Sequence, residues 1–596
     1  MRWKALMLTA RVTALAAVAI GRAAGQSVPA PHAENKPVVE WHVLGPLATS
    51  SRATYYRAQL EVDYLAATGG ERVAHLVFDT PVEFEGHQYL WQPAHADSAG
   101  HGEFATVFPD AAGPAVFYAA ALIDSPGEQV LLKLASVSST RVWLNGRQVT
   151  DILNPIREMN TESVTVPVQL TAGSNLLLLK VSQGAKKAAG FGAALLPAQT
   201  ATQRMLSWLP FLLVAVFWAV VTIVASKLRP TVPDAHPAGR LVCLDALRGF
   251  DMFWITGGGL VVMLLAQRSG NYALLEQLDH QTWNGFHFWD LIFPLFLFIV
   301  GTAIPFAFAK RLDEGGSRRA LYVHVVKRSL TIFAVGLLLA GGLKRIGTGD
   351  LRIAGVLQRI AICYCVCSLL YVHLSIKKII GVSVAILLGY WAVMAFVPVP
   401  GVGAGVYLPD LNLANWLDRQ YLPGRMYQGT WDNEGILSTF PAIVTCLLGV
   451  LAGTWLRGSN TERRKTAGLV AAGVAAIAVG WIWDLWLPVN KLLWTSSYVL
   501  VAGGWSLLLL ALFYWVIDVK QWRRWSFPFV VIGANAIAIY AFEGFISFRE
   551  VATRLVGGPI ASTFGSYQGV WLALATYVVA WGALYWLYKR RIFIKL

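Results

Sequence analysis

Charged side chains and cysteines are both scarce in this sequence of 596 residues. Charged residues make up 14% of the chain and hydrophobic residues 56%, a balance that excludes an ordinary soluble protein and an intrinsically disordered one. The 5 cysteines lie in or beside apolar stretches, so the sequence contains neither a disulfide framework nor a CxxC metal pair. Most of the chain is therefore expected to lie in a membrane.

Several familiar signatures are also missing. No Walker A loop, HExxH motif or GxSxG elbow occurs, which argues against ATP-driven transport, zinc proteolysis and α/β-hydrolase chemistry, and no metal is expected. The net charge of +15 does not require a nucleic acid, because basic residues in the cytoplasmic loops of a membrane protein produce the same excess. We therefore expect a lipid bilayer as partner and no nucleic acid.

The N-terminus is predicted to be an export signal over residues 1–25. Arg2 and Lys4 precede an apolar stretch, and the small residues Ala23 and Gly25 stand at plausible positions for cleavage. An arginine inside the apolar stretch leaves an uncleaved membrane anchor as the alternative. In either case, the segment that follows is expected outside the cytoplasm.

Residues 30–203 are predicted to form a β-sandwich in the periplasm. Short alternating stretches such as VLLKLASVSSTRVWLNGRQV and NLLLLKVSQG are separated by turn residues, as in antiparallel strands. The phrases WHVLGPL, RVWLNGRQV and LTAGSNLLLLKV resemble the galactose-binding-like jelly rolls of secreted carbohydrate-active proteins. That resemblance implies glycan binding, and a folded spacer without a ligand is the open alternative.

About eleven apolar segments long enough to cross a bilayer follow the β-sandwich. The first is predicted at 204–228, and alternating crossings then place most clusters of Lys and Arg on the cytoplasmic side. The fold class is therefore a polytopic α-helical membrane protein with an N-terminal extracytoplasmic β-sandwich domain and a cytoplasmic C-terminus. The triplet Gly257 to Gly259 predicts close helix packing or a helix break inside one span. The segments lie near residues 205–226, 250–267, 286–308, 329–343, 353–374, 379–398, 436–456, 467–487, 492–517, 528–546 and 568–588.

The segment at 286–308 contains a carboxylate, Asp290, and two histidines, His280 and His287, precede it. A carboxylate in hydrocarbon is costly unless it is paired or lines a wet cavity, so its presence predicts a function. Asp290 lies three residues after His287, where both can share a helical face. A buried carboxylate can orient an imidazole and raise its basicity, as a general base requires. The sequence leaves open which of the two histidines Asp290 serves.

Six stretches of the chain occur in the order found in one enzyme family. They are RLVCLDALRGFDMFW, LDHQTWNGFHFWDLIFPLFLFIVG, LRIAGVLQRIAICY, WDNEGILSTFPAIVTCLLGVLAG, LPVNKLLWTSSYV and IGANAIAIYAFE. Through them the chain resembles the heparan-α-glucosaminide N-acetyltransferase family, and its bacterial branch most of all, over about residues 239–590. The resemblance implies a transmembrane acetyltransferase domain at 239–590, which takes acetyl-CoA from the cytoplasm and acetylates an amino sugar or glycan across the membrane. It also implies a homodimer, while the export signal and the β-domain suggest a Gram-negative bacterium and its inner membrane as the location.

The resemblance assigns the catalytic histidine to His280, in HQTWNG. Lysosomal members also use an Asn eleven residues earlier; that spacing falls here on Ser269, and Asn271 two residues away is the candidate. Asp290 completes the predicted catalytic set. A histidine with a pKa near ambient pH can take the amine proton or carry the acetyl group itself, so direct and ping-pong transfer both remain open.

Other polar residues in or beside the spans are expected to bind the two substrates. Arg248, whose guanidinium matches phosphate geometry, and Asp251 are candidates for binding acetyl-CoA, with a local ion pair as the alternative for Arg248. Arg359 is a third candidate for the donor, and inside a span it is expected to pair with a carboxylate such as Asp290 or Glu434. The candidates for binding the sugar are Trp283, Asn284, His287, Asn433, Glu434, Asn490 and Lys491.

Three other functions remain open at this point. An amino-sugar permease would also need a polar cavity, but it would need no acetyl-CoA. A glycan O-acetyltransferase would use the same donor with a hydroxyl acceptor. A membrane-tethered glycan-binding protein would bind its ligand only through the β-domain, although the retained HQTWNG motif argues against it.

Overall fold

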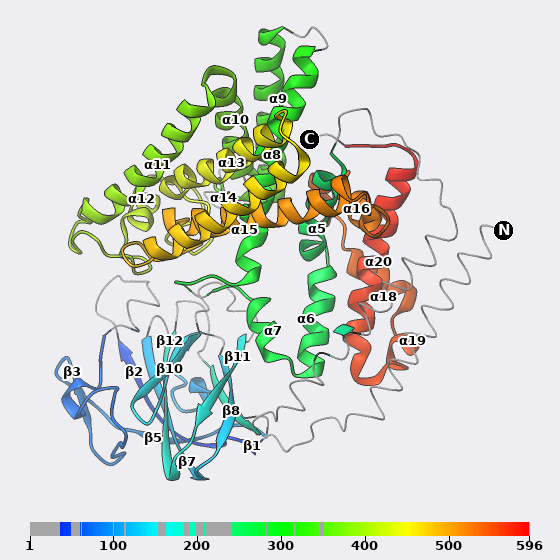
Figure 1. Ribbon diagram of the computed structural model, residues 1–596. Coiled ribbons are helices and arrows are strands. Elements are labelled where there is room, and N and C mark those ends of the chain that lie inside the picture. The colour runs from blue at the N-terminus through cyan, green and yellow to red at the C-terminus, as the bar shows by residue number, and fades with distance from the viewer. Residues whose placement is uncertain are drawn as a thin grey trace.

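The computed structural model describes residues 36–48, 60, 62–98, 100–111, 115–136, 138–152, 162–183, 190–197, 208, 211–212, 241–281, 283–313, 317–345 and 351–594. Within these residues, an N-terminal β-sheet domain is followed by a C-terminal helical region (Figure 1). The predicted signal or anchor at 1–25 and nearly all of the predicted first span at 204–228 lie outside the described residues.

Two antiparallel sheets form the N-terminal domain. One has the strand order β1-β13-β8-β11 with β6 paired to β13, the other has the order β10-β9-β12-β7-β2-β5, and β3 pairs with β4. Apolar side chains from both sheets, among them Phe117 and Leu132, form a core between them, which confirms the predicted β-sandwich. The strands are β1 (Lys36–Pro37), β2 (Glu40–Ala48), β3 (Val82–Phe84), β4 (His87–Tyr89), β5 (Gln92–His95), β6 (His101–Glu103), β7 (Ala115–Pro126), β8 (Gln129–Ser136), β9 (Ser139–Leu144), β10 (Arg147–Ile152), β11 (Glu162–Gln169), β12 (Ala172–Gln183) and β13 (Gly190–Pro197).

The sheet that contains β12 is buried on both faces. Successive side chains of a strand point to opposite sides, so a strand covered on both faces has a continuous hydrophobic run. In β12, Leu177 and Leu179 lie in the core between the sheets, whereas Leu176 and Leu178 pack with Trp143 on the opposite face. This double burial explains the LLLL run of the sequence.

A buried ion pair fastens the segment that covers this opposite face. Lys180 on β12 is fully buried, and its Nζ lies 2.7 Å from Glu71 Oε1 and 3.0 Å from the carbonyl oxygen of Leu60. The ammonium also donates to the carbonyl of Val62, and the Tyr118 hydroxyl donates to Glu71. A buried charge pair needs such additional hydrogen bonds to offset the loss of hydration.

Eight to ten membrane spans can be assigned by length and composition within the described part of the chain. Eight single helices are long and apolar enough to cross a bilayer, and two bent pairs, α5 with α6 and α16 with α17, raise the number to 10. They agree with all the predicted segments except the one at 204–228, and the predicted membrane fold class is confirmed. The helices are α5 (Val242–Ile255), α6 (Gly258–Ser269), α7 (Tyr272–Gln277), α8 (Phe288–Asp313), α9 (Arg318–Leu339), α10 (Val356–His373), α11 (Ile376–Phe396), α12 (Leu413–Tyr421), α13 (Ile436–Arg457), α14 (Glu462–Trp483), α15 (Ser496–Phe513), α16 (Phe527–Gly533), α17 (Ala536–Glu543), α18 (Phe548–Val556), α19 (Pro559–Ser562) and α20 (Gln568–Lys589).

The glycine triplet breaks a span, as predicted. The axes of α5 and α6 differ by 54° across the break. Gly257, between the two helices, has a φ of +98°, a left-handed conformation that glycine adopts without steric cost. The triplet therefore stands at a bend between two apolar helices and is not a phosphate-binding loop.

Helix α8 is the central helix of the region. It packs most extensively against α13, and it also contacts α15, α5 and α10 (Figure 1). The crossing with α13 requires glycine, because a Cβ on Gly301 would lie 1.9 Å from the carbonyl oxygen of Cys446, and one on Gly449 would lie 2.0 Å from that of Phe298. Small residues allow such close approach between membrane helices.

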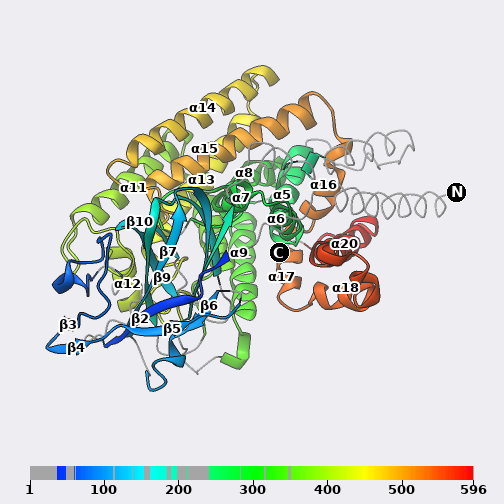
Figure 2. The ribbon, with the colours of Figure 1, turned by 90° about the horizontal axis from the view of Figure 1, so that it is seen from below.

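The β-sheet domain and α7 lie at the same end of the helical region in Figure 1, and in the view from below the strands lie in front of part of that region (Figure 2). Helix α7 leads directly into the loop that carries His280 and His287. This arrangement places the loop on the side of the helical region that faces the β-sheet domain.

Candidate active site

Asp290 stands in the first turn of α8 and is fully buried. Its Oδ2 accepts hydrogen bonds from the backbone N–H groups of His287 and Gln281, each at 3.1 Å. Backbone N–H groups at the start of a helix have no partner within the helix, and a carboxylate in the first turn satisfies them and complements the helix dipole. The start of α8 thus explains how this carboxylate is held at the end of a membrane span.

The other oxygen of Asp290 meets two cationic or protonatable groups. Its Oδ1 lies 2.9 Å from His280 Nδ1 and 3.3 Å from Lys491 Nζ, and Lys491 Nζ lies 3.0 Å from the same His280 nitrogen. Asp290 therefore serves His280, which answers the question that the sequence left open. A carboxylate can only accept, so we assign the imidazole proton to Nδ1, which leaves the lone pair on Nε2; the Lys491 ammonium then lies beside Nδ1 as a charge and does not donate to it.

The His280 ring is open to incoming molecules on its Nε2 side. Its side chain is 49% exposed, and Nε2 makes no hydrogen bond to any described residue. Desolvation by the surrounding protein lowers the pKa of His280, and the Lys491 ammonium lowers it further, while Asp290 and Asp279 act in the opposite sense. The imidazole is therefore neutral at pH 7 and able to accept a proton.

His287 does not share the carboxylate through its side chain. Its Nδ1 lies 3.1 Å from the backbone oxygen of Asp279, and its Nε2 lies 3.8 Å from Glu276 Oε1. Only its backbone N–H binds Asp290. The two histidines of the motif thus have different positions, and His280 alone combines a buried carboxylate with an open ring nitrogen among the described residues.

Two of the predicted sugar-binding residues, Asn284 and Asn490, join the two loops that hold the site, and a third, Trp283, ties the first loop to the connection between α11 and α12. Asn490 is fully buried, and its Nδ2 donates to Asn284 Oδ1 at 3.1 Å. The adjacent Gly285 N–H donates to the carbonyl of Val489 at 2.7 Å, and buried Trp283 donates from Nε1 to the carbonyl of Tyr407 at 2.8 Å. These contacts fix the loop before α8 to the turn before α15 and to the segment before α12.

Asn271 caps a short helix beside this loop. Its Oδ1 accepts the backbone N–H of Leu274 at 3.1 Å, at the start of α7. The side chain is buried, and its Nδ2 has no hydrogen-bond partner in the described part of the chain. The cap accounts for the oxygen of Asn271 and leaves its amide N–H groups available.

Arg352 pairs with two carboxylates just before α13, Asp432 and Glu434, and this acidic cluster was not predicted from the sequence. Arg352 binds Asp432 through two hydrogen bonds of 2.8 and 2.7 Å, and it also pairs with Glu434. Although burial lowers the pKa of Arg352, the hydrogen bonds to Asp432 and the charge of Glu434 raise it well above its usual range. Burial raises the pKa of Glu434.

One signal for this acidic cluster was present in the sequence: Arg352 is a basic residue in a loop predicted on the outer side, where the positive-inside rule expects few basic residues. Asn433 Oδ1, next to the cluster, accepts from Gln428 Nε2 at 2.9 Å.

The prediction that Arg359 pairs with a carboxylate is wrong. Its Nη2 donates to Ser438 Oγ and its guanidinium lies 4.9 Å from the centre of the Trp494 ring, but no carboxylate of the described residues forms an ion pair with it. The reason is that Asp290 and Glu434 are already occupied by other donors. Arg359 is fully buried, and its Nε and Nη1 have no hydrogen-bond partner in the described chain.

Arg248 and Asp251 lie on α5 and do not contact each other through an ion pair. Arg248 Nη1 lies 3.3 Å from Asp245 Oδ1, which is the local ion pair that the sequence left as an alternative. Asp251 is fully buried, and neither of its oxygens has a hydrogen-bond partner among the described residues. Neither residue belongs to the group of contacts around His280.

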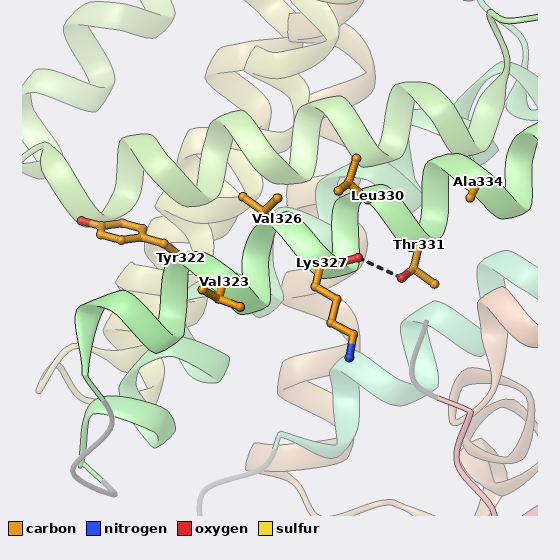
Figure 3. A pocket seen from close by; sticks show the side chains of 7 residues that line it. All are labelled: Tyr322, Val323, Val326, Lys327, Leu330, Thr331 and Ala334. Atoms are coloured by element: carbon orange, nitrogen blue, oxygen red, sulfur yellow. Dashed lines mark hydrogen bonds between the residues drawn. The ribbon is translucent and has the colours of Figure 1, made fainter.

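A shallow groove lies on α9, apart from these residues. Most of its lining is apolar, as expected for a helix face that meets lipid, and it contains none of the predicted site residues. The described residues also contain no group of three or more His, Cys, Asp or Glu side chains that could hold a metal ion. The groove is lined by Tyr322, Val323, Val326, Lys327, Leu330, Thr331 and Ala334 (Figure 3).

The fold and the site define a polytopic membrane protein with a histidine and a carboxylate paired at the end of a central span. Residues 240–483 match the family model described as heparan-alpha-glucosaminide N-acetyltransferase, catalytic, which confirms the resemblance seen in the motifs over this segment. The chain is similar to the heparan-alpha-glucosaminide N-acetyltransferase of Homo sapiens, with 29% identity over 386 residues, 54% of this chain and 57% of the relative. It is 27% identical to that of Mus musculus over 447 residues, 62% of this chain and 64% of the relative. The chain thus spans about six-tenths of the length of these relatives, both of which are named for an acyltransferase activity.

Proposed function

We propose that the chain is a transmembrane acetyltransferase that moves an acetyl group from acetyl-CoA to the amine of a glucosamine-type sugar or glycan. The observation that carries this proposal is the buried Asp290 carboxylate on Nδ1 of His280, whose Nε2 is open. The match of residues 240–483 to the acetyltransferase family model supports the same chemistry.

The proposed reaction needs a base because a protonated amine cannot attack. The amine nitrogen attacks the thioester carbonyl carbon, a C–N bond forms, and the C–S bond breaks. His280 Nε2 takes the proton that the amine loses, and the proton then passes to the departing CoA thiolate. A route through an acetyl group on Nε2 uses the same lone pair, so both routes depend on the Asp290 contact.

Donor and acceptor are proposed to reach His280 from opposite sides. For the donor, the two nitrogens of Arg359 that lack a partner, Nε and Nη1, favour an oxygen of acetyl-CoA, and Arg248 and Asp251 on α5 remain candidates. For the acceptor, Asn271 offers a free amide N–H beside the loop. The roles of Glu434 and of the other predicted sugar-binding residues in contacting the sugar stay predictions, as does the homodimer.

We also propose a bacterial inner membrane with the β-domain at 30–203 in the periplasm and the acetyltransferase domain at 239–590. The supporting observations are the distribution of basic residues and the position of α7, which precedes His280, at the end that faces the β-sheet domain (Figure 1). The export signal or anchor at 1–25 and the first span at 204–228 belong to this same topology.

The test uses purified protein in liposomes with acetyl-CoA supplied on one side and glucosamine on the other. Acetylated sugar identified by mass spectrometry supports the proposal, and resistance of the product to alkaline hydroxylamine assigns the acetyl group to nitrogen rather than oxygen. Sugar that crosses the membrane unchanged, with no dependence on acetyl-CoA, would instead identify a permease.

The pH dependence follows from the pKa shift of His280. Because only the neutral imidazole can accept the amine proton, transfer should fall as pH decreases through the pKa of His280. That pKa is lowered, so the acidic limb of kcat/KM should have its midpoint below about 6.5, the ordinary value for histidine. A midpoint above that value would contradict the assignment of His280 as the base.

A further inference from the structure

Lys491 occupies an unusual position beside the proposed base. It lies in the turn between α14 and α15, 211 positions from His280 in sequence, and its side chain is 17% exposed. The turn is rigid, because the buried Asn490 accepts the Leu493 N–H at 2.9 Å and donates to Asn284. The lysine side chain is therefore delivered from a fixed backbone.

The Lys491 ammonium, the His280 imidazole and the Asp290 carboxylate form a triangle. Its sides are 3.0 Å from Nζ to Nδ1, 3.3 Å from Nζ to Oδ1, and 2.9 Å from Nδ1 to Oδ1. Asp290 Oδ1 accepts a hydrogen bond from His280 Nδ1 and forms an ion pair with the Lys491 ammonium, so one carboxylate serves two potential cations. If the imidazole takes a second proton, two positive charges face each other across 3.0 Å, and one negative charge has to balance both.

We propose that Lys491 is a positioning residue that acts through His280: its ammonium shares Asp290 with the imidazole and opposes a positive charge on the ring. Nε2 thereby keeps its lone pair at neutral pH, and the proton taken from the amine is released again quickly. This inference rests on the proposed function, and it assigns Lys491 a different role from the sugar contact expected from the sequence.

The charges around the pair come from several parts of the chain. Asp279 lies in the same loop as His280, Asp290 lies on α8, and Lys491 lies in the turn before α15, while Glu434 before α13 acts on Lys491. The three carboxylates favour a positive charge nearby. Within this group of described residues, Lys491 is the cation that opposes protonation of His280, so its removal has an effect of defined sign.

The experiment measures the protonation of His280 directly in the folded, full-length protein. Diethylpyrocarbonate modifies neutral imidazole, so its rate of reaction at His280, followed by peptide mass spectrometry across pH, gives the pKa of that ring without any acetyl transfer. Lys491→Met should raise this pKa by about one pH unit, the Coulomb effect of a charge at this distance in a water-like medium. Lys491→Arg keeps the charge and should leave the pKa within about 0.3 units of the wild-type value.

The same variants are then compared in the transfer assay. For Lys491→Met, the acidic limb of kcat/KM should move to higher pH by the same amount, and Lys491→Arg should restore the wild-type profile. An unchanged diethylpyrocarbonate titration together with a higher KM for the sugar would overturn the inference and make Lys491 a substrate contact. If the wild-type protein transfers no acetyl, the proposed function fails, yet the titration still shows whether Lys491 opposes protonation of His280.

Discussion

Replacing Asp290 with asparagine tests the most specific contact of the site. The Oδ2 position accepts two backbone N–H groups, so the amide oxygen of the introduced side chain should take that place. Its NH₂ group would then face His280 Nδ1, where the carboxylate oxygen now lies at 2.9 Å. An amide N–H donates, so Nδ1 would have to accept, and the imidazole proton would move to Nε2. The imidazole ring would keep its position, but its Nε2 would carry a proton and could no longer accept the amine proton.

The expected loss can be estimated from the contribution of a positioned base. General base catalysis contributes about 10²–10⁴-fold, so Asp290→Asn should lower kcat by that factor, or by about 3–5 kcal/mol in the barrier. The assay is transfer of labelled acetyl to glucosamine in proteoliposomes, normalised to protein that elutes as a single species. Glu276→Gln is the matched control, because it removes an exposed carboxylate near the other histidine and should leave the rate unchanged. An Asp290→Asn protein that folds and retains more than about a third of the wild-type kcat would refute the reasoning.

Three further predictions concern the scaffold. Arg352→Met leaves the two carboxylates of the acidic cluster buried without a cation. The free energy of unfolding should therefore fall by about 3–5 kcal/mol, seen as a lower thermal midpoint. An unchanged midpoint would show that the cluster does not stabilise the fold. Lys180→Met should destabilise the β-sheet domain by a similar amount, because Glu71 loses its ion-pair partner. Limited proteolysis of the full chain should then cleave that domain faster than in the wild-type protein. Equal cleavage rates would contradict this prediction. Gly449→Val should abolish the yield of folded protein, because a Cβ there would lie 2.0 Å from a carbonyl oxygen of α8, and a normal yield would mean that this crossing can open.

Local patterns were sufficient to predict much of the fold. The length of the apolar segments predicted the spans, since a helix of about twenty residues is needed to cross a bilayer. The glycine triplet predicted the break before α6. Period-two alternation indicated the β-sandwich. The LLLL run of β12 departs from that alternation, and the reason is tertiary: a loop segment held by Lys180 covers the outer face of the sheet.

The partners within the site could not be predicted in the same way. Asp290 was identifiable as a costly charge in an apolar segment, but its choice of His280 depends on how the loop after α7 folds back onto α8. Lys491 comes from a turn far along the chain, and no local pattern connects it to that loop. Arg359 was expected to take a carboxylate, but charge pairing in this interior is decided by which donors reach each carboxylate in the packed structure.

The central claim is that His280 takes the proton of the acceptor amine. The most direct test compares His280→Ala with His373→Ala, a histidine at the C-terminal end of α10 whose Nε2 contacts the Tyr322 hydroxyl at 3.2 Å. Both proteins are placed in nanodiscs with labelled acetyl-CoA and glucosamine, and acetyl-CoA binding is measured in parallel. We predict that both bind acetyl-CoA and that only His280→Ala loses transfer. Transfer by His280→Ala at the rate of His373→Ala would contradict the claim.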